Sequence, residues 1–63
     1  MTKEQINFIK RANKFVVAKD NESKEFSDWA TAATFYNSNV RTANKIELSA
    51  ICGMVGMTIA YKY

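Results

Sequence analysis

Proline and histidine are absent from the 63 residues, and the chain has only two glycines and one cysteine. A single cysteine excludes an intramolecular disulfide and a zinc site built from cysteines alone. Without histidine, the chain also lacks the commonest metal ligand and the commonest acid–base group of enzymes. We therefore expect a protein that is not an enzyme and has no catalytic residue, metal site or cofactor.

What is present fits a small globular protein. Hydrophobic residues make up 48% of the chain, and nine basic residues against six acidic ones give a net charge of +3. This hydrophobic share is too high for a disordered chain, and the length leaves room for one small domain, residues 1–63, with a thin core. The charge excess favours weak attraction to polyanions and is smaller than in a dedicated nucleic-acid binder.

The sequence also indicates a compartment. No apolar segment typical of a secretory signal follows the N-terminus, and the weakly polar stretch 48–61 is shorter than the roughly 20 apolar residues of a membrane-spanning helix. A lone cysteine suits the reducing cytosol. We expect a soluble cytoplasmic protein with no membrane partner. The many asparagines and lysines and the small size would suit an accessory protein of a phage or mobile element, working in the cytoplasm of the host cell.

A first helix is predicted at about residues 3–13. Thr2 and Gln5 have the spacing of a capping box, which places the helix start at the N-terminus. Ile6 and Ile9 then share one side of the helix, while basic and amide side chains gather on the opposite side. The pattern is that of an amphipathic helix.

A second helix is predicted at about residues 27–38. Ser27 is a suitable N-cap, with Asp28 in the first turn, where the helix dipole favours a carboxylate. Trp29 and Tyr36 follow at helical spacing and are expected in the core. The asparagines that end this segment tolerate the left-handed conformation of a helix C-terminus.

Residues 14–19 fit two interpretations. The apolar spacing of the first helix continues into them, yet the Phe-Val-Val run favours a strand and residues 20–23 have the composition of a turn. We favour the strand. Residues 24–26 would then return beside it as a short hairpin arm.

The C-terminal third decides the fold class. As a helix it would be apolar on nearly every side and would contain both glycines, which favours a hairpin instead. Its strands are predicted at about 45–52 and 57–63, around a loop at 53–56. The predicted fold is therefore α+β, with two amphipathic helices packed on a small antiparallel sheet that ends in this hairpin. The alternative is an all-α three-helix bundle.

One strand register in the hairpin combines an apolar face with a charge pair. Placing Cys52 opposite Met57 gathers the apolar side chains on one face, with Tyr61 among them. The same register sets Glu47 opposite Lys62 on the other face. We expect this register in the folded protein.

Basic residues on the first helix are the candidate polyanion-binding site. They are Lys3, Lys10, Arg11 and Lys14. Each phosphate that such a group neutralises would add a salt-dependent increment to affinity. The simpler interpretation is that they form the solvated face of an amphipathic helix.

Aromatic residues left over after the core is filled are the candidate protein contacts, namely Phe8, Phe35 and Tyr63. We expect a small binding or regulatory module that acts through protein–protein interaction, with another protein or a second copy of the chain as partner. The alternative is a small basic nucleic-acid-binding protein that uses the basic face of the first helix.

Overall fold

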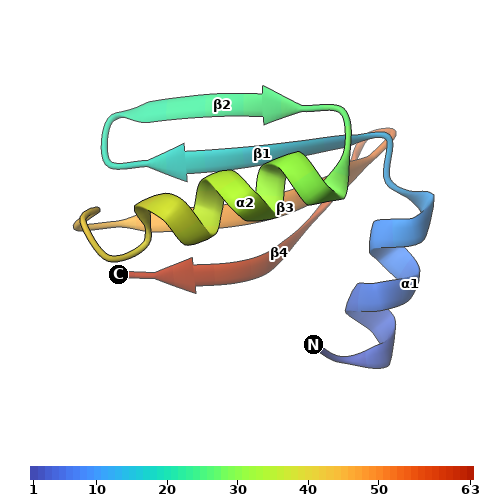
Figure 1. The fold of residues 1–63 in the computed structure, drawn as a ribbon. Coiled ribbons are helices and arrows are strands. Elements are labelled where there is room, and N and C mark those ends of the chain that lie inside the picture. The colour runs from blue at the N-terminus through green and yellow to red at the C-terminus, as the bar shows by residue number, and fades with distance from the viewer.

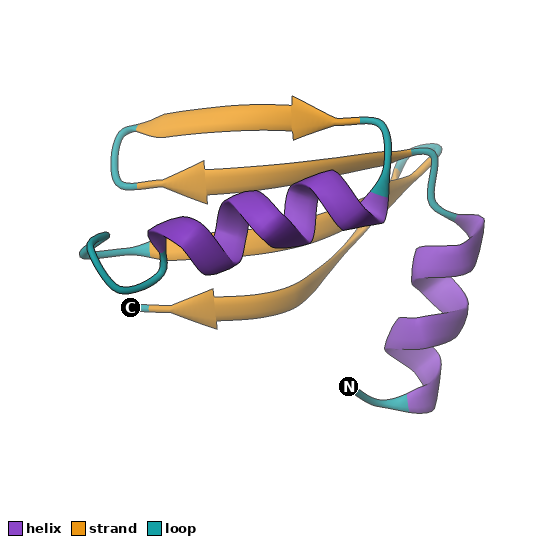
Figure 2. Cartoon of the chain, viewed as in Figure 1, coloured by secondary structure: helices purple, strands orange, loops and turns teal.

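Two helices and a four-stranded antiparallel sheet make up the fold (Figures 1 and 2). The computed structural model describes all 63 residues. The elements are α1 (Lys3–Arg11), β1 (Lys14–Lys19), β2 (Glu22–Phe26), α2 (Trp29–Asn39), β3 (Ile46–Cys52) and β4 (Val55–Lys62). The strand order is β2-β1-β3-β4. The predicted α+β class is confirmed, and the three-helix alternative is wrong.

The start of α1 is as predicted. The Gln5 amide N–H donates to the Thr2 hydroxyl at 3.1 Å, and the Gln5 side chain accepts from the Thr2 N–H at 2.9 Å. The helix ends at Arg11, two residues before the expected end. Ala12 is already extended, and the Asn13 N–H donates to the Ile51 carbonyl at 3.0 Å, so bonding to the sheet replaces the last helical turn.

The strand interpretation of residues 14–19 is confirmed. Phe15 and Val17 of β1 are buried, whereas Val16 and Ala18 point to the other face of the sheet. The returning strand β2 is longer than the arm predicted at 24–26. The two strands pair antiparallel along their length.

The N-cap of helix α2 lies one residue later than predicted. Asp28, not Ser27, is the N-cap, and its carboxylate accepts from the N–H and the hydroxyl of Thr31 at 3.0 Å and 2.8 Å. A carboxylate at the cap also meets the positive end of the helix dipole. Asp28 therefore takes the role that the sequence pattern gave to Ser27.

The hairpin turn is shorter than predicted. It consists of Gly53 and Met54 alone, and β4 already begins at Val55. Gly53 has φ +63°, as the first position of a two-residue type II′ turn requires, whereas Gly56 lies within the strand. One glycine thus makes the reversal that was assigned to both.

The predicted register of the hairpin is wrong. Cys52 lies opposite Val55, and the pairing shifts by one residue at an irregularity between Leu48 and Ser49. Lys62 consequently faces the helices and donates to the Val40 and Ala43 carbonyls, both at 2.9 Å. Glu47 and Lys62 therefore do not pair, and Tyr61 lies on the face opposite the core.

The core lies between the helices and one face of the sheet. In Figure 1, α2 runs across the front of the sheet and α1 packs beside one end of it. The Trp29 ring meets Phe15 edge-on at 5.8 Å between ring centres. The buried residues are Phe8, Phe15, Val17, Ala32, Ala43, Ile46, Leu48, Ala50 and Ile59. As expected, Trp29 and Tyr36 pack against this cluster, although both are only partly buried.

Candidate protein-contact surface

The face of the sheet that points away from the core is uncovered, and we call it the open face. It lies behind the sheet as drawn in Figure 1. The strand pairing places these residues on it: Lys14, Val16, Ala18, Ser23, Glu25, Glu47, Ser49, Ile51, Gly56, Thr58 and Tyr61. Tyr63 lies at its end, next to Tyr61 and Glu47. None of them is buried. The open face is therefore a continuous accessible surface across all four strands.

Two tyrosines stand at one end of the open face. The Tyr61 and Tyr63 ring centres are 5.1 Å apart, and the two residues are 65% and 73% exposed. The Tyr63 hydroxyl donates to the Glu47 carboxylate. That hydrogen bond, with a smaller effect from desolvation, raises the pKa of Tyr63. Tyrosines with an apolar ring and a polar tip are enriched at protein interfaces.

Each charged group on the open face has a partner on the same face. The Lys14 ammonium lies 3.7 Å from the Glu25 carboxylate. Glu47 accepts from the Ser49 hydroxyl at 3.2 Å and from Tyr63. A protein docking there would not have to cover an unpaired charge, which is costly to desolvate.

The middle of the open face is small and partly apolar. Val16 and Ile51 are half-buried by their neighbours, and Ala18 and Gly56 have little or no side chain to project from the sheet. A methyl group built on Gly56 would lie 3.0 Å from the Cδ1 of Ile51, so this isoleucine extends over the glycine. The face therefore has a shallow centre and a raised aromatic end.

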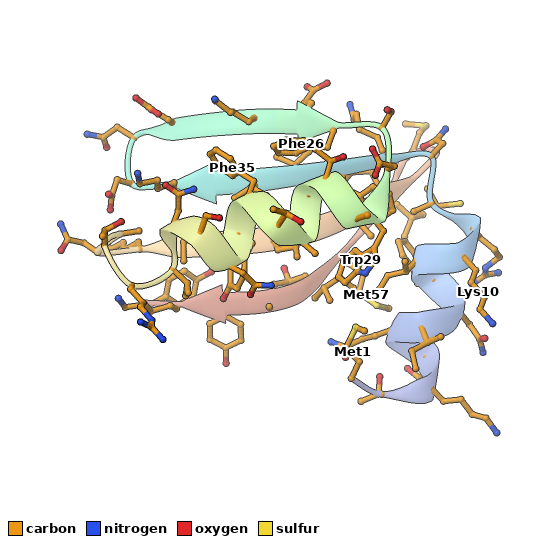
Figure 3. All side chains as sticks on the ribbon, viewed as in Figure 1. Met1, Lys10, Phe26, Trp29, Phe35 and Met57 are labelled. Atoms are coloured by element: carbon orange, nitrogen blue, oxygen red, sulfur yellow. The ribbon has the colours of Figure 1, made fainter.

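Of the predicted protein contacts, only Tyr63 lies on this surface. Phe8 is 7% exposed and belongs to the core, so its prediction as a contact is wrong. It is the one buried residue of α1 and packs into the core cluster. Phe35 is half-buried on the opposite side of the sheet, and its ring centre lies 5.4 Å from that of Phe26 (Figure 3). The Lys24 ammonium lies 5.0 Å from the centre of the Phe35 ring. The Phe26 and Phe35 rings line a shallow hollow of about 470 Å³ between β2 and α2.

The four predicted polyanion-binding residues do not form one site. Lys3, Lys10 and Arg11 are exposed on α1, and Lys10 points away from the sheet in Figure 3. Lys14 lies on β1, on the open face, because α1 ends before it. Lys10 and Arg11 line a shallow hollow of about 420 Å³ with Asn7. Both occupy the last turn of α1, where the helix dipole favours cations.

Tyr61 is the exposed aromatic residue of the open face that the sequence pattern missed. The expected register placed it on the packed face, and the one-residue shift at Leu48 and Ser49 turns it outward. A shift of one residue moves a side chain to the other face of a sheet. No feature of the sequence marks this irregularity.

Comparison of the chain with models of protein families, with curated proteins and with solved structures finds no match to any of them. No group of three or more cysteine, aspartate or glutamate side chains is placed to hold a metal ion. Neither helix has the length and apolar character needed to cross a membrane.

Proposed function

We propose that the chain is a small non-catalytic module that binds a protein through its open face. The observation that carries this proposal is the exposed pair of neighbouring tyrosines, Tyr61 and Tyr63. Exposed aromatic rings of this size add apolar surface to water unless a partner covers them. Tyrosine is also among the residues that contribute most to binding energy at interfaces.

The charge of the open face favours a protein over a nucleic acid. It carries one basic residue, Lys14, and two acidic ones, Glu25 and Glu47. A phosphate backbone would meet a net negative surface there, whereas nucleic-acid binding surfaces concentrate lysine and arginine. The tyrosines would then have to bind bases without any cationic support.

Site-specific photocrosslinking tests the proposal. The photoreactive residue p-benzoylphenylalanine replaces Tyr61 in cells that naturally make the chain, and replaces Thr34 in a control. Thr34 is exposed on α2, on the opposite side of the sheet. We expect a crosslinked protein from position 61 and none from position 34. The absence of any product from position 61, or equal products from both positions, would contradict the proposal.

We also propose a second candidate, binding of polyanions by α1, which the hollow lined by Asn7, Lys10 and Arg11 supports. Replacing both basic residues, as Lys10→Glu with Arg11→Glu, should abolish a salt-sensitive gel shift with duplex or single-stranded DNA. The control is Lys24→Glu, which changes a basic residue on β2. This candidate fails if the unmodified chain gives no shift at low salt, or if the control removes the shift equally.

A further inference from the structure

We infer that the open face binds a second copy of this chain, giving a symmetric dimer in which the two sheets pack face to face and the helices lie outside. This inference rests on the proposed function and names its partner. It is carried by the charge distribution over the molecule and by the arrangement of large and small side chains on the open face.

Charge permits two copies to meet on this face in particular. Of nine basic and six acidic residues in the chain, only Lys14 and the pair Glu25 and Glu47 lie on it. The remaining surface thus carries the net positive charge, and two such surfaces would repel each other. On the open face each charged group already has a partner within the same copy, so two copies can approach there without covering an unpaired charge.

Side-chain size along one row of the sheet supports self-packing. The strand pairing aligns Ser23, Ala18, Glu47 and Tyr61 in a row from β2 to β4. The side chains of this row are small on β2 and β1 and large on β3 and β4. A two-fold axis along the strands, between β1 and β3, places the large side chains of one copy against the small side chains of the other.

This symmetry gives compatible neighbours in two rows of the open face. It sets Tyr61 against the second copy's Ser23, and it sets Glu47 against the second copy's Ala18. In the adjacent row, Thr58 meets the second copy's Glu25, so that a hydroxyl faces a carboxylate. Packed sheets lie about 10 Å apart, and a large side chain facing a small one fills that gap without collision.

The size of the face sets the expected strength. Four strands span about 19 Å and five residues along them about 17 Å. The area of the face is therefore smaller than the roughly 800 Å² that each partner buries in a standard interface. Contacts of this size are weak, so we expect a monomer–dimer equilibrium at high protein concentration rather than a permanent dimer.

Sedimentation velocity of the purified chain over a concentration series tests the inference. Tyr61→Ser leaves a void and Ser23→Tyr sets two large rings against each other, so each should weaken dimerisation at least tenfold. The double variant exchanges the large and small ends of the row and should recover most of the loss. Thr34→Tyr on α2 is the matched control and should leave the equilibrium unchanged, and circular dichroism checks that each variant is folded.

Three outcomes would overturn the inference. The purified chain could stay monomeric at millimolar concentration, the dimer could be insensitive to both single variants, or the double variant could show the sum of the two losses. The proposed function fails separately: it survives a monomeric chain if photocrosslinking at position 61 captures a different protein, and it falls if that position captures nothing.

Discussion

Gly53 is the residue on which the turn of the β3–β4 hairpin depends. Its φ of +63° is strained for any residue with a Cβ, although no atom lies within 4 Å of a Cβ built there. Gly53→Ala should therefore lower the free energy of unfolding by about 1 kcal/mol through backbone strain alone. Gly53→Asn should cost less, because asparagine tolerates this conformation. Urea denaturation measures both, and an equal loss for alanine and asparagine would contradict the explanation.

Asp28 couples the stability of α2 to pH. The hydrogen bonds from the backbone and side chain of Thr31 lower the pKa of Asp28 below its usual value. A carboxyl with a lowered pKa in the folded protein stabilises it at pH values above the unfolded pKa, and this contribution is lost as the pH falls through the folded pKa. Asp28→Asn keeps an oxygen that can cap the helix but does not titrate.

We therefore expect the stability of the unmodified chain to fall more steeply below about pH 4 than that of Asp28→Asn. Thermal unfolding followed by circular dichroism between neutral and acidic pH measures the difference. Parallel pH curves for the two proteins would show that the Asp28 carboxylate does not contribute in this way.

At the scale of helices and strands, sequence patterns predicted what local interactions determine. The capping box at Thr2, the strand at 14–19 and the hairpin near Gly53 all follow from neighbouring residues, and the structure has each of them. The location of Tyr61 depends instead on the irregularity between Leu48 and Ser49, which shifts the pairing of β4 by one residue and turns Lys62 toward carbonyls of the loop after α2. The pattern within the strand does not mark this shift, so the location of Tyr61 could not be predicted.

Lys62 links β4 to the loop between α2 and β3. Its ammonium donates to the carbonyls of Val40 and Ala43, which follow the end of α2. Lys62→Met keeps the aliphatic stem and removes both bonds, and should lower the free energy of unfolding by about 1.5–3 kcal/mol, as for a bond to a charged group. Hydrogen exchange at the Val40 and Ala43 amides should also become faster.

The control for this prediction is Lys45→Met, which removes a charge from the same loop. The Lys45 ammonium makes no hydrogen bond, so its loss should leave amide exchange at Val40 and Ala43 unchanged. If both variants accelerate exchange equally, the effect comes from the charge and not from the two bonds.

For the whole molecule, the small core limits stability, and association through the open face would increase it. Nine buried residues stabilise the entire fold, and a domain of this length is expected to be stable by only about 3–9 kcal/mol. Leu48 is 2% exposed at the centre of that core, and Leu48→Ala should cost about 2–5 kcal/mol. The variant should therefore be close to unfolding at low protein concentration.

Association through the open face would make the stability of Leu48→Ala depend on protein concentration. A partner that binds only the folded chain stabilises it by mass action, so the Tm of a dimerising protein rises with its own concentration. We expect the Tm of Leu48→Ala to rise over a hundredfold concentration range, by an amount set by the affinity of the dimer. Adding Ser23→Tyr, which blocks the partner but leaves the core intact, should remove the rise. A Tm that depends on concentration equally with and without Ser23→Tyr would mean that the stabilising contact lies elsewhere on the molecule.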